Sequence, residues 1–149
     1  LRGATSDVAD FTSGKFEPVL DDTRVANKSA VRRVVLHAGK IHYDLATEVE
    51  KRELTDIALV RLEQYYPLPL QELDAVLAQY PNAEYLWAQE EPENQGAWPF
   101  VSLELSRRLG GRRISVASRP AAASPATGST KRSAQQQVDL IDRALTIGG

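Results

Sequence analysis

The side chains best suited to take part in chemistry lie in segment 89–98, which reads Gln-Glu-Glu-Pro-Glu-Asn-Gln-Gly-Ala-Trp. Two adjacent carboxylates, Glu90 and Glu91, stand close to two side-chain amides, Asn94 and Gln95. Neighbouring carboxylates push each other's pKa values apart, which is a common basis for an acid/base pair. Adjacent residues of an extended strand point to opposite faces, however, and no nucleophile accompanies the glutamates in the sequence. The segment therefore favours a structural or interface role over catalysis.

The flanking sequence indicates that this segment is a strand-to-helix junction. An apolar run, 83–88, precedes it, and an amphipathic stretch ending near Leu109 follows it. In open α/β folds, ligands and partner domains meet the sheet at the carboxyl ends of its strands. An ordinary turn is the simpler alternative, because proline, asparagine and glycine are common turn residues.

Arg119 follows another predicted strand and has the geometry for a bidentate contact at the same edge of the sheet. The loop after it, 120–130, is rich in Ala, Ser and Pro, and Ser129, Thr130 or Ser133 can cap the next helix. We expect the two junctions to emerge on one side of the sheet and to form a continuous interdomain edge. Glu90 or Glu91 can then pair with Arg119. The residues of this expected edge are Glu90, Glu91, Asn94, Gln95 and Arg119.

The two histidines, His37 in a predicted strand and His42 in the first turn of a helix, favour structural or surface roles. Asp44 lies two residues from His42, so the two side chains are on different faces of the helix. Gly39 and Lys40 lack the longer glycine-rich turn of a phosphate loop and the three spaced glycines of a dinucleotide fingerprint. No Gly-x-Ser-x-Gly nucleophile elbow is present either.

The composition fits one ordinary α/β domain. The chain has 149 residues, 42% hydrophobic content and a formal charge of −2, which gives no basic field for nucleic acid or anionic membranes. No apolar run approaches the ~20 residues that cross a bilayer, and no signal peptide is recognisable. The absence of cysteine excludes disulfides and thiolate chemistry and agrees with a cytoplasmic location. The start at Leu1 without methionine suggests a segment of a longer polypeptide.

Alternating strand and helix patterns position these residues. Residues 1–30 show no period and are interpreted as a linker from a preceding domain, with a short helix near 6–11. Residues 31–149 form an α/β domain, a three-layer, Rossmann-like sandwich with a parallel or mostly parallel sheet. Trp98 is expected to anchor a helix to the core with Val101 and Leu105. The expected strands are 33–38, 57–62, 83–88 and 113–117, and the expected helices are 40–52, 69–80, 98–109 and a last one through 138–145.

Three further segments accompany 89–98 in order. Segment 59–69 reads Leu-Val-Arg-Leu-Glu-Gln-Tyr-Tyr-Pro-Leu-Pro, segment 118–128 reads Ser-Arg-Pro-Ala-Ala-Ala-Ser-Pro-Ala-Thr-Gly, and three glutamines, 135–137, precede the last helix. Together these segments resemble the C-terminal domain of the thiamine-diphosphate-dependent, decarboxylating component of 2-oxoglutarate dehydrogenase, a transketolase-like enzyme. The resemblance extends over residues 34–145 and implies the C-terminal domain of that fold for residues 31–149.

In this family the cofactor and most acid/base residues belong to two earlier domains, and the Gly-Asp-Gly…Asn motif that binds thiamine diphosphate is absent here. The resemblance thus implies that this domain alone binds neither thiamine diphosphate nor Mg²⁺ and carries no catalytic residue. It implies a full-length cytoplasmic homodimer of the tricarboxylic acid cycle. That enzyme decarboxylates 2-oxoglutarate and passes the succinyl group to a lipoyl-bearing succinyltransferase, and this domain supports its assembly.

The actinobacterial, multifunctional branch of the family adds acetyl-CoA as an effector. Lys15 and Gln64 match two of the positions that bind acetyl-CoA in that branch. Two other features differ: the branch's basic cluster after Pro-Leu-Pro is replaced by Leu-Gln-Glu at 70–72, and Pro18 replaces a small hydroxyl residue. Each charge-assisted hydrogen bond contributes about 1.5–3 kcal/mol, so we expect acetyl-CoA binding to be severely weakened. The alternative is a free-standing Rossmann-like module that binds a partner or a nucleotide.

Overall fold

The computed structural model describes residues 4–5, 8–107, 109 and 113–148. Strands and helices alternate from residue 33 onward, as the sequence patterns predict. The main difference is the third expected strand, which runs past residue 88 to Pro92. The elements are α1 (Val8–Thr12), β1 (Val19–Leu20), the 3₁₀ helix η1 (Lys28–Ala30), β2 (Arg33–His37), α2 (Ile41–Lys51), β3 (Ile57–Leu62), α3 (Leu70–Leu77), β4 (Glu84–Pro92), α4 (Trp98–Ser106), β5 (Ile114–Arg119) and α5 (Thr130–Leu145).

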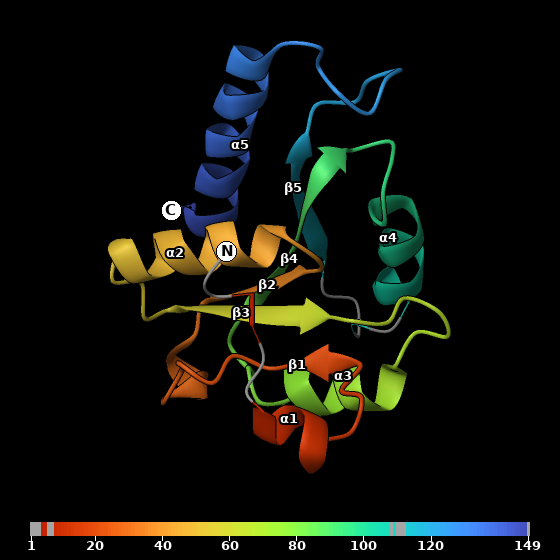
Figure 1. Ribbon diagram of the computed structural model, residues 1–149. Helices are drawn as coiled ribbons and strands as arrows, with labels where there is room; N and C mark the ends of the chain where they lie inside the picture. Colours follow the sequence, from red (N-terminus) through yellow and green to blue (C-terminus); the bar gives the residue numbers. More distant parts are fainter. Residues whose placement is uncertain (1–3, 6–7, 108, 110–112, 149) are drawn as a thin grey trace.

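In the described part of the chain, the sheet has five strands in the order β1-β3-β2-β4-β5. Strands β2 to β5 are mutually parallel, and only the edge strand β1 is antiparallel, pairing Val19 with Leu62. All five residues of β2 are buried, as expected for a parallel strand that is covered on both faces. The predicted α/β sandwich with a mostly parallel sheet is therefore confirmed (Figure 1).

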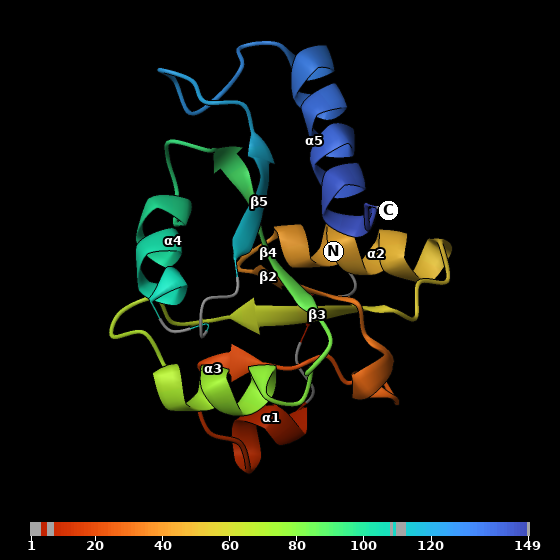
Figure 2. The same ribbon diagram turned by 180° about the vertical axis from the view of Figure 1, so that it is seen from behind.

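Two apolar cores flank the sheet, because successive strand residues point to opposite faces. Leu36 and Trp87 belong to the core under α3 and α4, whereas Val35 and Leu86 belong to the core under α2 and α5. Figures 1 and 2 show these helix pairs on opposite sides of the sheet. The strands are thereby held rigidly, and their carboxyl ends are fixed relative to one another.

The tryptophan buried in the core is Trp87, whereas the sequence analysis expected Trp98. Val101 and Leu105 of α4 are buried as expected, but Trp98 is only partly buried. Trp87, in the middle of β4, is 1% exposed. Trp98 is the first residue of α4, at the rim where the helix begins, so only part of its ring reaches the core.

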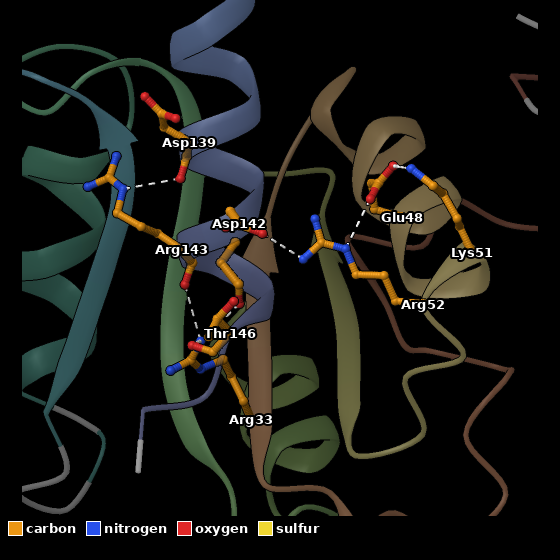
Figure 3. A network of polar contacts seen from close by, with 9 residues as sticks. Arg33, Glu48, Lys51, Arg52, Asp139, Asp142, Arg143 and Thr146 are labelled. Atoms are coloured by element: carbon orange, nitrogen blue, oxygen red, sulfur yellow. Dashed lines mark hydrogen bonds and ion pairs between the residues drawn. The ribbon is translucent and has the colours of Figure 1, made fainter.

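Helix α5 is fixed at its carboxyl end by Arg33, whose side chain is only 8% exposed. Its Nη1 donates to the carbonyl oxygens of Arg143 (3.2 Å), Ala144 (3.1 Å) and Thr146 (2.8 Å) (Figure 3). The last carbonyls of a helix have no partner within the helix, and a cation there also suits the helix dipole. One buried guanidinium thus joins the first long strand to the end of the chain.

Residues 21–30, which follow the edge strand β1, are bonded to the rest of the domain through two aspartates. Asp22 is buried and accepts a hydrogen bond from the Leu59 backbone N–H (2.8 Å), and Asp21 accepts one from the Tyr80 hydroxyl (2.5 Å). Helix α1 falls near the short helix expected at 6–11, of which residues 6 and 7 lie outside the described residues. The boundary between a linker at 1–30 and a domain at 31–149 stays a prediction.

Candidate functional site

The order of the strands reverses between β2 and β4. Strand β2 continues through α2 to β3 on one side, and β4 continues through α4 to β5 on the other. Ligands and partners of open α/β sheets bind at such a switch point, beyond the carboxyl ends of the strands. Here Lys40, just after β2, forms an ion pair with Glu90 of β4 (Nζ–Oε1 2.9 Å).

Glu90 and Glu91 are strand residues, which corrects the expectation that the strand ends at residue 88. Strand β4 is irregular between Ala88 and Pro92, where its register against β5 shifts, and Pro92 then pairs with Arg119. Such a bulge bends a strand and redirects its side chains. The shift allows β4 to continue alongside β5 to the residue where the next loop begins.

Gln89 organises the segment that follows it. Its side chain is 4% exposed, and Oε1 accepts hydrogen bonds from the Trp87 indole N–H (3.0 Å) and the Trp98 backbone N–H (2.8 Å). Nε2 donates to the carbonyl oxygens of Gln95 (2.8 Å) and Pro92 (3.1 Å). An amide offers two donors and two acceptor positions, so this one is fully used. Sequence reasoning did not place Gln89 among the site residues, although a polar residue ending an apolar run was the available signal.

The tight turn that follows β4 requires glycine at position 96. Its φ is +65°, a conformation that favours glycine, and a Cβ there would lie 2.9 Å from Glu91 Cβ. Strand β4, the turn at 93–97 and α4 are thereby held in one compact unit.

Asn94 and Gln95 join this unit to the loop after β5. The Asn94 side chain donates to the Ala122 carbonyl (3.1 Å) and accepts from the Ala122 N–H (3.0 Å). Gln95 Nε2 donates to the same carbonyl (2.8 Å). The two loops therefore lie side by side at one end of the sheet.

Arg119 is held by α5 rather than by a glutamate. Its Nη1 donates to Ser133 Oγ (3.2 Å) and its Nη2 to Gln137 Oε1 (3.1 Å). Gln137 in turn donates to Glu90 Oε1 (3.1 Å), so an amide connects Arg119 to the carboxylate. No direct ion pair joins Arg119 to Glu90 or Glu91 among the residues that the structure describes. Sequence spacing could not reveal Gln137, since it lies on the following helix.

A cavity of about 550 Å³ opens beside this network. Its wall carries two cations and two carboxylates, and the hydrogen bond from Lys40 to Glu90 raises the pKa of the Lys40 ammonium. Ser129, one of three expected caps, accepts from the Arg132 N–H (3.4 Å) at the start of α5. The polar wall includes Lys40, Asp44, Glu90, Arg119, Ser133 and Gln137.

Lys15 and Gln64, the residues that match effector positions, have local partners. Lys15 is exposed and lies 3.9 Å from a carboxylate oxygen of Glu17. Gln64 Nε2 donates to the Pro67 carbonyl (2.6 Å) within the loop after β3. Both side chains remain within reach of solvent.

At the cavity wall, Lys40, Asp44, Glu90 and Gln137 are hydrogen-bonded or ion-paired to one another. Within the described part of the chain, no three His, Asp or Glu side chains are grouped so that they could hold a metal ion. In the same part, no helix has the length and apolar character that a bilayer span requires.

Comparison with known proteins gives concordant matches. The family model for the 2-oxoglutarate dehydrogenase C-terminal region matches residues 5–145. The 2-oxoglutarate dehydrogenase E1 component of Cupriavidus necator is 42% identical over 146 residues, which cover 97% of this chain and 15% of that protein. The multifunctional 2-oxoglutarate metabolism enzyme of Mycolicibacterium vanbaalenii is 43% identical over 154 residues, covering 97% of this chain and 12% of that enzyme. The chain thus spans 12–15% of the length of these relatives.

Proposed function

The chain belongs to the 2-oxoglutarate dehydrogenase C-terminal family, and from this we propose that it serves as the non-catalytic C-terminal domain of a longer 2-oxoglutarate dehydrogenase or decarboxylase. In that enzyme the preceding domains hold thiamine diphosphate and Mg²⁺, decarboxylate 2-oxoglutarate and pass the succinyl group to a lipoyl-bearing succinyltransferase. The 12–15% share of the relatives' length supports a domain over the free-standing binding module.

The side chains described here do not fit thiamine diphosphate with its metal. A Mg²⁺ ion is bound through oxygen ligands, usually carboxylates together with phosphate oxygens. Two carboxylates at this end of the sheet are already engaged. Glu90 contacts Lys40 and Gln137, and Asp44 contacts the same two residues. We therefore assign no step of the reaction to this domain.

The observation that carries the proposal is the continuous edge made by the 89–95 segment and the loop after Arg119. Its two loops are joined through Asn94, Gln95 and Ala122, and α5 holds Arg119 in place. Glu91 and Asn94 are exposed on this edge. We propose that it packs on the preceding domains and supports the cytoplasmic homodimer.

Acetyl-CoA control is proposed to be weak or absent. Lys15 and Gln64 are present, but position 72 is an exposed glutamate where the multifunctional branch places basic residues. A carboxylate repels a phosphate group instead of binding it.

Replacing Arg119 tests the proposed role. In the full-length enzyme we expect Arg119→Ala to shift the dimer toward monomer, because the loop after β5 loses its contacts with Ser133 and Gln137. Affinity for thiamine diphosphate should stay nearly unchanged. Light scattering coupled to size exclusion measures the first quantity and calorimetry the second.

Arg32→Ala is the matched control, since Arg32 is an exposed arginine 3.6 Å from Asp56 at the opposite end of the sheet. It should leave the dimer intact. If the Arg119 variant stays dimeric while only decarboxylation slows, Arg119 acts closer to the chemistry than proposed here.

A further inference from the structure

A second cavity, of about 300 Å³, lies between the start of α2, the carboxyl-terminal half of β3 and the loop after β1. We call it the His42 pocket. It is on the side of the sheet that α2 and α5 cover, because Leu59 of its wall belongs to that core. Its polar wall consists of Asp21, Asp22, Thr23, Arg24, His42 and Arg61.

The hydrogen bonds of two histidines fix which nitrogen of His42 carries the proton. His37 Nδ1 lies 3.1 Å from the Val35 carbonyl oxygen, which can only accept, so His37 Nδ1 is protonated. Its Nε2 then bears a lone pair and accepts from His42 Nδ1 at 2.9 Å. The rings are parallel within 5° with centroids 5.1 Å apart, which fits two coplanar rings joined edge to edge. In neutral His42, Nε2 is therefore an unprotonated acceptor.

His37 supports either charge state of His42. Complete burial lowers the pKa of His37 to about 3, so it stays neutral and keeps accepting from His42 Nδ1. A proton added to His42 must enter at Nε2, and the resulting imidazolium can donate from there while His37 holds the ring. Fixing an imidazole through its other nitrogen is how proteins set its tautomer and orientation.

The carboxylates of the pocket are already occupied. Asp22 accepts from the Arg24 and Leu59 backbone N–H groups (3.0 and 2.8 Å) and from the Arg24 guanidinium. Asp21 accepts from the Tyr80 hydroxyl (2.5 Å) and from the Lys28 ammonium. These two side chains therefore leave little capacity for a ligand.

The arginines, in contrast, retain donors. Among the described residues, Arg61 makes one ion pair, from Nε to Glu63 (2.6 Å), and Arg24 makes one, from Nη2 to Asp22. A guanidinium has five N–H groups. Within the described residues, the terminal nitrogens of Arg61 and Nη1 of Arg24 have no protein acceptor.

From this convergence we propose that the His42 pocket binds a phosphate group, as inorganic phosphate or as a phosphate monoester. Phosphate oxygens accept from Arg24 and Arg61, and one proton is shared between the remaining oxygen and His42 Nε2. The second pKa of a phosphate monoester, about 6, is close to that of imidazole, about 6.5, so the shared proton suits phosphate better than a carboxylate of pKa about 4.

The charges around His42 set the direction of the pH dependence. Burial lowers the pKa of His42, Arg61 and Arg24 lower it further, and Asp22 raises it. A bound anion opposes the two arginines and favours protonation. Phosphate should therefore bind with uptake of a proton at neutral pH, and its affinity should fall up to tenfold per pH unit above about pH 7. The groups that face His42 are His37, Tyr43, Asp21, Asp22, Arg24 and Arg61.

Calorimetry on the intact protein saturated with thiamine diphosphate tests the proposal, with inorganic phosphate and phenyl phosphate titrated separately at pH 6, 7 and 8. Buffers of different ionisation enthalpy report the proton uptake. We expect His42→Gln to abolish the pH dependence and Arg61→Gln to weaken binding at least tenfold, while Arg32→Ala leaves both unchanged. Equal binding of the two probes identifies free phosphate as sufficient, and binding of phenyl phosphate alone identifies a monoester.

Binding that is independent of pH, or that survives both pocket variants, would overturn the proposal, as would the absence of saturable binding. Thermal unfolding of each variant shows whether the fold is kept. If Arg61→Gln unfolds, the His42→Gln variant and its proton uptake decide the matter alone, because that side chain is only half-buried.

Discussion

At the residue scale, the Gln89 side chain connects five backbone or side-chain groups at the start of the 89–98 segment. Oε1 accepts from Trp87 and Trp98, and Nε2 donates toward the carbonyls of Gln95, Pro92 and, at 3.4 Å, Glu91. A buried polar group is costly unless its hydrogen bonds are formed. The path of the exposed residues after Gln89 thus depends on one buried amide.

We expect Gln89→Ala to lower the free energy of unfolding by about 2–4 kcal/mol, because the buried Trp87 indole N–H loses its acceptor and two carbonyls lose a donor. Chemical denaturation followed by tryptophan fluorescence measures the change. Gln135→Ala is the control. Its amide is exposed on α5 and, among the described residues, bonds Asp139 alone, so about 0.5 kcal/mol or less is expected. Equal losses in the two variants would mean that Gln89 does not organise the segment.

At the scale of elements, α5 is the helix that connects the site to the rest of the domain. In its amino-terminal half Ser133 and Gln137 hold Arg119, and at its carboxyl end Arg33 binds three carbonyl oxygens. Arg52 of the α2 terminus adds an ion pair to Asp142 (2.7 Å) (Figure 3). The position of the Arg119 loop therefore depends on contacts made at the other end of the helix.

Arg33→Ala should destabilise the protein by about 3 kcal/mol, since it removes hydrogen bonds from a buried cation to three helix carbonyls. Amide hydrogen exchange should rise most in the last turn of α5. Arg32→Ala, at the exposed neighbouring position, should change stability by less than about 1 kcal/mol. Protection of α5 that is unaltered in the Arg33 variant would contradict this assignment.

At the scale of the whole molecule, the sheet and its apolar cores bury His37 so completely that the neutral form of its side chain is favoured in the folded protein. His37 is 0% exposed in β2, and burial lowers its pKa from 6.5 to about 3. Between these values the unfolded chain binds a proton that the folded chain does not bind. Folding stability must therefore rise with pH in this window, being complete above pH 6.5 and decreasing as the pH falls toward 3.

His37→Gln removes this titration. One proton corresponds to a slope of about 1.4 kcal/mol per pH unit. As the pH is lowered from about 6 to about 4, the free energy of unfolding of the wild type should therefore decrease more steeply than that of the variant, by up to this slope. Denaturant unfolding at several pH values measures both slopes, and the carboxylates contribute equally to each. Parallel slopes would show that His37 is protonated in the folded state.

The sequence by itself determined the fold class and the family. The apolar, β-branched run 57–62 predicts a buried strand, and the helical spacing of Ile41, Leu45 and Val49 predicts a helix with one buried face. Both patterns depend on local burial, so they hold for any order of the strands in the sheet. The motifs at 59–69, 89–98 and 118–128 indicated the family, which the comparisons confirmed. Ser129 was one of the caps that local capping chemistry allowed.

Only the tertiary structure decided which side chains meet. The order β1-β3-β2-β4-β5 brings Lys40 to Glu90, and the packing of α5 brings Gln137 between Glu90 and Arg119. Arg33 reaches carbonyls more than a hundred residues away. Periodicity records whether a residue is buried, but not its neighbour, because parallel strands joined by crossover helices can be ordered in several ways with the same local pattern.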